Sequence, residues 1–348
     1  MRLYLYSFFS VFLSIVGINI FFDPANLLSN KILISRYYAN ELLDGNSVSL
    51  PKSIDTRALH SSLISLNRKK VDIAVLGTSR VHFINSNTLK NHRILNNGIG
   101  GSNILEIIGL YQAYLNKGEP YPSTMIIGLD EWFFYSRRTR ALSQWIIYEN
   151  EIKQFLATEN VRFSPGFADW FETSSEEGSF WLRLKTIFSL QYFLNSIHTT
   201  DSIYLFPDGH LQFPSSMLNR SKESAYEAFH KTIENFDSYT LSGFAGPGPD
   251  EWKLFMALIQ SMRSKNITPV LFLSPHQHEV YQYMKKRKEG HAIDNLEVEI
   301  RKYANQRNIR IVGSYNPYFV PCGQDEFMDE HHMREVCYSR LFEAGLDK

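Results

Sequence analysis

The chain has 348 residues, of which 44% are hydrophobic and 21% charged, a composition that can bury a sizeable core and excludes a wholly disordered protein. Lysine plus arginine equals aspartate plus glutamate at 36 each, so no global charge favours a nucleic-acid partner. The length is compatible with one α/β domain that carries insertions. Aromatic residues reach 14%, which suits a wide core, a membrane-proximal surface or a carbohydrate-facing cleft.

The first candidate element is an uncharged apolar run at residues 3–22. A helix of this length, at ~1.5 Å per residue, spans the ~30 Å hydrocarbon core of a bilayer. Arg2 precedes it, which favours a cytoplasmic N-terminus, and no small-x-small cleavage site follows it. Residues 1–23 are therefore predicted to be an uncleaved transmembrane anchor, and residues 24–70 a stalk and lead-in. The polar residues in the run leave open a buried helix of a soluble domain: Ser7, Ser10, Ser14 and Asn19.

Short apolar, β-branched runs predict five buried parallel strands, at residues 71–76, 93–96, 124–129, 267–273 and 309–312. Helical periodicity falls between them, at 104–115, 251–262 and 296–304. This alternation predicts a three-layer α/β/α sandwich with a five-stranded, mostly parallel sheet. The segment from about 134 to 248 separates the third and fourth strands, and we expect it to form a helical insertion within a domain covering 71–348.

A serine follows the first predicted strand, in the sequence Gly77-Thr78-Ser79-Arg80. Ligands of an open parallel sheet bind at the carboxyl ends of its strands. A serine on a tight strand-to-helix turn presents its hydroxyl at that edge, where a base can reach it. The alternative is that Ser79 only caps the helix that follows.

A glycine-rich turn that includes Gly98, Gly101 and Asn103 follows the second strand and leads into a helix. Glycines let backbone N–H groups approach a ligand, and a helix N-terminus favours a developing negative charge. The alternative is a β-to-α turn that merely needs unusual backbone angles. Both descriptions can hold together.

An Asp-x-x-His pair follows the fifth strand, at Asp329 and His332. His332 could take the serine proton while Asp329 orients the ring and stabilises its cation. His331 is the alternative base. A distance of ~2.6–3.2 Å from Ser79 Oγ to the His332 ring would support the triad, whereas ~8 Å would exclude it.

The serine, the glycine turn and the Asp-x-x-His pair occur in the order that characterises the SGNH/GDSL hydrolase superfamily, which the chain resembles over roughly residues 71–343, insertion excepted. The resemblance implies a flavodoxin-like sheet. It also implies that Ser79 is the nucleophile, His332 the base and Asp329 its partner, with Gly101 or Gly98 an oxyanion donor beside the Ser79 N–H.

Two blocks depart from the family pattern. The first reads Gly-Thr-Ser instead of Gly-Asp-Ser, and the third has Asp130 where the family has an oxyanion-binding asparagine. An ionised carboxylate cannot donate a hydrogen bond and would repel an oxyanion. Either Asp130 has another role, or Asn97 or Asn103 supplies the donor, or the site is inactive. Residues near the strand ends are expected to line the substrate cleft: Arg80, Asp130, Trp132, His276 and His331.

The two cysteines, Cys322 and Cys337, lie near the C-terminus. They could form a disulfide if the anchor holds the domain in an oxidising compartment, and would be ordinary thiols in a cytosolic protein. A zinc site shared with the adjacent histidines is disfavoured because the spacing matches no common ligand pattern. We expect no metal and no cofactor.

These features together predict a membrane-anchored, extracytoplasmic serine esterase or O-acyltransferase in the periplasm or at the cell surface. The resemblance implies the substrate, an acylated envelope glycan or a small ester, because tethered relatives serve polysaccharide acetylation and teichoic-acid alanylation. A membrane acyl-donor protein is a further expected partner, and nucleic acid is not one. The alternative is a catalytically inactive SGNH-fold subunit that binds glycan or assembles an envelope complex.

Overall fold

The computed structural model describes residues 2–22, 33–50, 56–141, 144–174, 203–213, 227 and 241–346. Its main sheet has five strands in the order β3-β2-β4-β7-β8, and every neighbouring pair is parallel. The strands are β2 (Ile73–Gly77), β3 (Ile94–Gly98), β4 (Thr124–Gly128), β7 (Thr268–Leu273) and β8 (Arg310–Gly313). All five predicted strands are confirmed, with shifted ends. The first strand is internal to the sheet, as in the doubly wound order 2-1-3-4-5.

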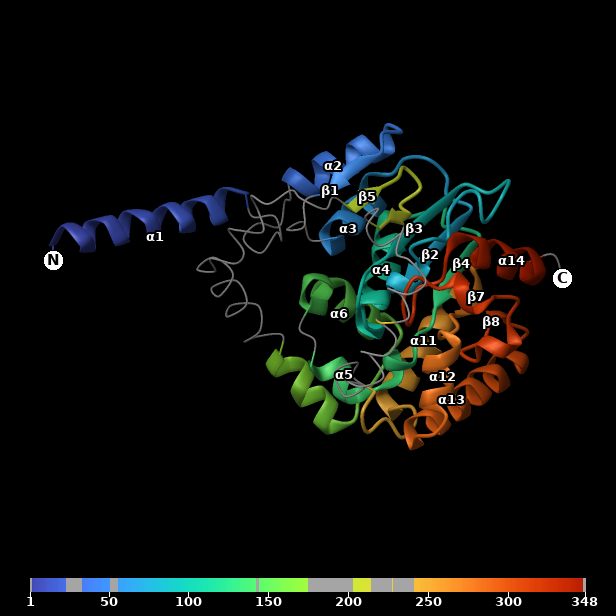
Figure 1. Ribbon diagram of the computed structural model, residues 1–348. Helices are drawn as coiled ribbons and strands as arrows, with labels where there is room; N and C mark the ends of the chain where they lie inside the picture. Colours follow the sequence, from blue (N-terminus) through green and yellow to red (C-terminus); the bar gives the residue numbers. More distant parts are fainter. Residues whose placement is uncertain are drawn as a thin grey trace.

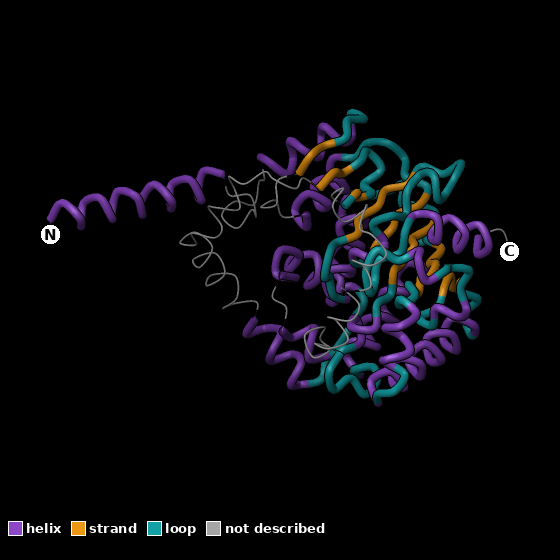
Figure 2. Tube along the Cα trace, viewed as in Figure 1, coloured by secondary structure: helices purple, strands orange, loops and turns teal. Residues whose placement is uncertain are grey.

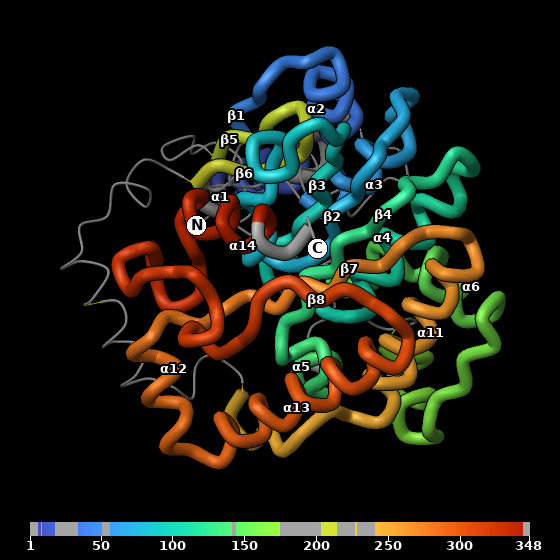
Figure 3. The backbone as a smooth tube through the Cα atoms, turned by 90° about the vertical axis from the view of Figure 1, so that its right-hand side faces the viewer, coloured from blue at the N-terminus to red at the C-terminus, as the bar shows by residue number. Residues whose placement is uncertain are grey.

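Helices cover both faces of this sheet, so the predicted three-layer α/β/α arrangement is confirmed (Figure 2). One face carries α4 (Ile104–Lys117), α11 (Pro249–Ser264) and α13 (Lys288–Asn305). Tyr111 of α4 donates to Ser261 of α11 at 3.0 Å, and Tyr303 of α13 packs on Phe255 of α11. The other face carries α14 (Glu335–Leu346), which faces the viewer in Figure 3 and packs Phe342 on Phe272 of β7.

Residues 33–66, which we expected to be part of a stalk, fold against the domain. They form α2 (Leu33–Leu43), β1 (Val48–Leu50) and α3 (Thr56–Leu66). β1 pairs antiparallel with β5 (Ile203–Leu205), which pairs with β6 (Leu211–Gln212). The packing comes from a second apolar core that a solvated stalk would not bury: Ala39, Leu42, Leu50, Leu59, Leu63, Leu205 and Leu211. Residues 24–32 and 51–55 lie outside the described residues.

The N-terminal apolar run forms one helix, α1 (Arg2–Phe22), which projects from the rest of the molecule in Figure 1. Among the described residues, no helix is both long enough and apolar enough to cross a bilayer. The transmembrane anchor is therefore not confirmed and stays a prediction.

The predicted insertion is helical in its described first part. It contains α5 (Ser136–Ala141), α6 (Glu149–Thr158) and a helix at residues 165–174, joined by stacked aromatic rings such as Trp145 on Phe171. The β5–β6 hairpin was not predicted. Residues 142–143, 175–202, 214–226 and 228–240 of the insertion lie outside the described residues. The helix α12 (His278–Met284) and 3-10 turns complete the described elements: Ser79–Val81, Glu131–Phe134, Gln144–Tyr148, Pro317–Phe319 and Gln324–Glu326.

Candidate active site

Ser79 begins a single 3-10 turn directly after β2 and Thr78. The side chain of Val81, in the same turn, packs over three glycines that end neighbouring strands. A Cβ atom would lie 2.7 Å from Val81 at Gly77, 2.7 Å at Gly98 and 2.3 Å at Gly128, which is closer than side chains tolerate. The three glycines therefore let the turn that carries Ser79 lie flat against the strand ends.

Ser79, His332 and Asp329 form a continuous hydrogen-bonded chain. The Nε2 atom of His332 lies 2.8 Å from Ser79 Oγ, and its Nδ1 atom lies 2.8 Å from Asp329 Oδ2. With the Nδ1 proton donated to the carboxylate, Nε2 is free to accept the serine proton, which is the geometry a general base requires. The distance from Ser79 Oγ to His332 lies within the ~2.6–3.2 Å that supports the triad.

The surroundings of the triad keep the Asp329 carboxylate ionised and leave Ser79 partly exposed. Burial alone would raise the pKa of Asp329, but the His332 ring and the backbone N–H groups of His331 and His332 outweigh it and hold the pKa well below its usual range. Asp329 is buried, whereas Ser79 and His332 are half-buried. Phe213 packs edge-on against the His332 ring at 5.2 Å.

The glycine turn after β3 lies beside the nucleophile. The N–H of Ile99 donates to the Gly77 carbonyl at 2.9 Å, and the Ser102 hydroxyl donates to the same carbonyl at 3.2 Å. Gly101 adopts φ +67°, a conformation that favours glycine. Among the described residues, no acceptor is bonded to the N–H of Gly101 or Ser79.

Gly98, the other predicted oxyanion donor, has no free N–H, because this group already donates to Asn96 Oδ1 at 2.9 Å. We therefore correct its assignment from oxyanion donor to packing partner of Val81. Gly101 remains the backbone candidate of the two.

Asn97 and Asn103, the two candidate side-chain donors to an oxyanion, differ in their hydrogen bonds. Both polar atoms of the Asn97 side chain already have partners: Oδ1 accepts from Tyr114 at 2.6 Å, and Nδ2 lies 3.2 Å from His60 Nδ1. Asn103 caps α4 through Oδ1, which accepts from two backbone N–H groups. Its Nδ2 is buried and has no hydrogen-bond partner among the described residues. Asn103 is thus the asparagine with a donor to spare.

Asp130 faces Arg80 and Thr78. One carboxylate oxygen accepts from Arg80 Nη1 at 2.8 Å, and the other accepts from the Thr78 hydroxyl at 2.5 Å. Burial raises the pKa of Asp130, and the Arg80 guanidinium opposes that rise. Both oxygens are engaged behind the nucleophile turn, which gives Asp130 a role other than oxyanion binding.

Arg80 joins the ends of three strands. It is 1% exposed, and besides Asp130 it binds Glu131 Oε2 at 2.9 Å and the carbonyls of Ser274 and Pro275 at 2.7 and 3.2 Å. Burial would raise the pKa of Glu131, but His276, which bonds to it, and Arg80 lower it to about 2. The guanidinium thus ties the turn after β2 to the segments after β4 and β7.

The residues expected to line the cleft are all buried, which corrects that expectation: Arg80, Asp130, Trp132, His276 and His331. Three of them belong to the ion-pair cluster, because ionised groups removed from water need opposite charges around them. Trp132 donates to the Ser102 carbonyl at 3.2 Å, and the His331 ring lies between Trp132 and His276. The hydrogen bond to Ser79 Oγ comes from His332, so His332 is the base that the geometry offers.

Sequence reasoning missed two tyrosines that brace the site. Tyr338 of α14 donates to the Arg80 carbonyl at 2.7 Å, and Tyr315 donates to the Leu129 carbonyl at 3.0 Å. Nothing in their sequence context identifies them. In the sequence, the two adjacent acids Asp130 and Glu131 directly after an apolar strand could have indicated that a buried cation lies beside them.

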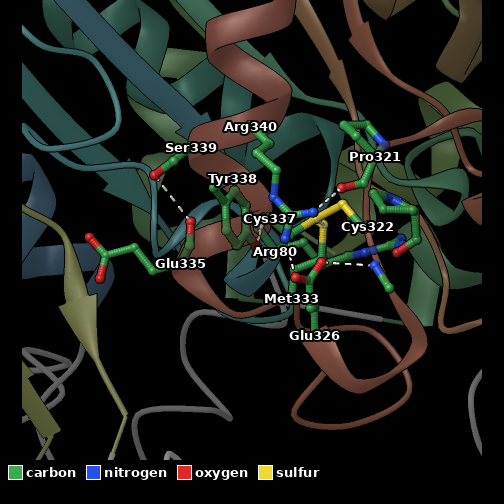
Figure 4. Close-up of a disulfide and its surroundings, with 12 residues drawn as sticks. Arg80, Pro321, Cys322, Glu326, Met333, Glu335, Cys337, Tyr338, Ser339 and Arg340 are labelled. Atoms are coloured by element: carbon green, nitrogen blue, oxygen red, sulfur yellow. Dashed lines mark hydrogen bonds and ion pairs between the residues drawn. A yellow bond between two sulfur atoms is a disulfide. The ribbon is translucent and has the colours of Figure 1, made fainter.

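Cys322 and Cys337 form a disulfide with Cα atoms 5.4 Å apart (Figure 4). The loop that it closes contains Asp329 and His332, so the base and its partner lie on a covalently bounded segment. Arg340 donates to the Pro321 carbonyl, directly before this loop, at 2.7 Å, and to Glu326 within it.

Replacing both cysteines by alanine is expected to lower the free energy of unfolding by ~3 kcal/mol, the chain-entropy value for a loop of about 15 residues. Urea denaturation of the oxidised protein and of the variant would measure the difference. Dithiothreitol should destabilise the wild type and leave the variant unchanged. Equal stability of the two proteins under oxidising conditions would contradict the expectation.

Two buried histidines near the site predict acid sensitivity. Burial lowers the pKa of His60 to about 4 and that of His82 to about 3. Both are neutral in the folded protein while the unfolded chain binds protons below pH ~6.5. Stability therefore falls as the pH drops from ~6.5 towards 4, by ~1.4 kcal/mol per pH unit for each histidine. Urea midpoints at three pH values should show a shallower slope for His82→Gln than for the wild type, and an unchanged slope would refute this.

No protein family matches the chain, and no curated protein is similar to it in sequence. The arrangement described above, a Ser-His-Asp chain at the carboxyl edge of a parallel α/β sheet, is thus the basis for a functional conclusion.

Proposed function

We propose that the protein is a serine-dependent esterase or O-acyltransferase that works through an acyl-enzyme at Ser79. The observation that carries the proposal is the unbroken chain from Ser79 Oγ through His332 to Asp329, with 2.8 Å at each contact. Nucleophile, base and orienting carboxylate within hydrogen-bond distance are the signature of an activated serine.

In the first half-reaction, His332 Nε2 takes the proton as Ser79 Oγ adds to the ester carbonyl. The resulting oxyanion is stabilised by the N–H groups of Ser79 and Gly101 and by Asn103 Nδ2. Collapse breaks the bond to the alcohol, which leaves with the proton from His332. The acyl-enzyme is then attacked by water, giving a carboxylic acid, or by another hydroxyl, giving a new ester, and His332 again moves the proton.

The SGNH resemblance supports an acylated envelope glycan as the substrate. The strand order and the contacts from Ser79 through His332 to Asp329 are compatible with that resemblance. Asp130 is the main feature that favours a non-catalytic subunit, and its bonds to Arg80 and Thr78 give it a structural role that is compatible with catalysis.

An extracytoplasmic, membrane-attached location belongs to the same proposal. Its support is the disulfide, which persists in oxidising compartments, and the exposed apolar side chains of α1. Tyr6 is 73% exposed and Leu13 65% exposed, a surface that water does not favour.

A fluorophosphonate probe tests the proposal, because it reacts only with activated serines. Intact-mass and peptide analysis should show one adduct per chain, on Ser79. Ser79→Ala should remain unlabelled. Ser274→Ala is the matched control, since the Ser274 hydroxyl is buried near Arg80 and has no hydrogen-bond partner among the described residues. Failure of the folded wild type to react would overturn the proposal.

A further inference from the structure

A cavity of about 550 Å³ is lined by neighbours of the triad, and its volume is within the ~300–1,000 Å³ typical of small-molecule sites. Its wall includes Met328, which precedes Asp329 and whose N–H donates to the His332 carbonyl at 2.8 Å. Phe83 also lines it and packs on Phe213, the ring that lies edge-on to His332. The cavity and the catalytic histidine therefore share two supporting segments.

The opposite wall is the β5–β6 hairpin, which is fastened to the sheet. Asp208 accepts from the Ser86 N–H and hydroxyl at 2.9 and 2.7 Å, and its carbonyl accepts from the Asn96 N–H at 2.7 Å. A Cβ at Gly209 would lie 2.2 Å from the Asn96 carbonyl oxygen, so the hairpin backbone is in direct contact with β3. The wall is preformed, which lowers the entropy that a ligand would lose on binding.

The lining matches a polar, uncharged ligand. Phe206 and His210 stack with 4.2 Å between centroids and 6° between planes, which makes a flat aromatic wall. Gln212 and Asn87 bring amides that both donate and accept hydrogen bonds. Arg334 and Glu335 offset each other in charge.

Other ligand classes fit less well. An acyl chain would need a continuous apolar wall, whereas three amides, a histidine and two charged residues interrupt the apolar surface of this one. A polyanion would need a surplus of cations, and the balanced lining has none. A sugar ring has apolar C–H faces that pack on aromatic rings and hydroxyls around its edge that bond to amides.

We propose that this cavity binds a neutral sugar unit, the hydroxyl-bearing part of the ester or of the acyl acceptor that reacts at Ser79. The proposal rests on the function proposed above. It places the sugar on the β5–β6 side of the triad, against Phe206 and Gln212.

The test uses the full-length Ser79→Ala protein, which can bind but not turn over. Calorimetric titration with maltotetraose, cellotetraose and tetra-N-acetylchitotetraose should detect binding of at least one, at Kd of about 1 mM or tighter. Phe206→Ala and Gln212→Ala, added to Ser79→Ala, should each weaken it by about 10-fold or more. Tyr204→Ala is the matched control, because Tyr204 is an exposed aromatic side chain of the same hairpin outside the cavity lining, and it should change Kd by less than about 2-fold.

Three results would overturn the sugar site. The first is no binding of any of the neutral tetrasaccharides at about 10 mM. The second is binding that both cavity substitutions leave unchanged in proteins with wild-type melting temperatures, and the third is Phe206-dependent binding of octanoate instead of a sugar. Because fluorophosphonate labelling is measured separately on the wild type, the two proposals fail separately. Absence of labelling together with sugar binding would contradict the proposed reaction and support the sugar site. Labelling of Ser79 without sugar binding would contradict the sugar site alone.

Discussion

Ser79→Ala is expected to lower kcat for p-nitrophenyl acetate hydrolysis by about 10⁴-fold or more. The substitution removes the atom that forms the acyl-enzyme, and neither His332 nor the oxyanion donors can replace it. The Michaelis constant and the unfolding midpoint should change little, because Ser79 is half-buried and its hydroxyl bonds to His332 alone among the described residues.

The same assay separates the members of the chain. Asp329→Asn should cost about 10³- to 10⁴-fold in kcat, since the amide would favour the wrong tautomer of His332. Ser79→Ala combined with Asp329→Asn should be no slower than Ser79→Ala alone, because the residues act as one unit. Turnover by Ser79→Ala within about 10-fold of the wild type would exclude the mechanism, and Ser274→Ala should retain full activity.

Arg80→Met is expected to lower the free energy of unfolding by ~3–5 kcal/mol, because it leaves Asp130 buried without a cation and Glu131 with His276 alone. Lysine should restore only part of the stability. It carries the charge but cannot reach two carboxylates and two carbonyls at once.

A double-mutant cycle distinguishes a charge network from simple packing. Asp130→Asn removes the acid that Arg80→Met leaves without a cation, so the double variant should be more stable than the sum of the single effects predicts, by ~1–3 kcal/mol. Urea unfolding of the four proteins gives the coupling. Additive effects, or a cost below ~1 kcal/mol for Arg80→Met, would show that the ion pairs do not support the turn. Asp130→Asn should not increase esterase activity, because the residue faces Arg80 and Thr78.

The sheet was predictable because buried parallel strands have a simple signature. Runs such as 124–129 are apolar and short, and their ends are marked by glycines that the packing of Val81 requires. The same reasoning placed Ser79, Asp329 and His332 at one edge, since residues that follow parallel strands meet there. These local patterns need no knowledge of distant contacts.

The rest depends on pairings between remote segments. That Asp130 binds Arg80, and not a substrate, follows from a contact between residues 50 positions apart, which no local pattern encodes. The lead-in looked like a stalk because the partner of β1 is a strand beginning at Ile203. Likewise, Gly98 looked like an oxyanion donor until Asn96 was found to accept its N–H.

The packing of Val81 over Gly77, Gly98 and Gly128 has a consequence for how this site can vary. Four positions from four segments share one small volume, so their side-chain sizes are coupled. Among homologous sequences, alanine at any of the three glycine positions should co-occur with a smaller residue at position 81. The turn that presents the nucleophile is therefore inherited as a set of matched residues, and a motif limited to the residues flanking the serine would describe only part of it.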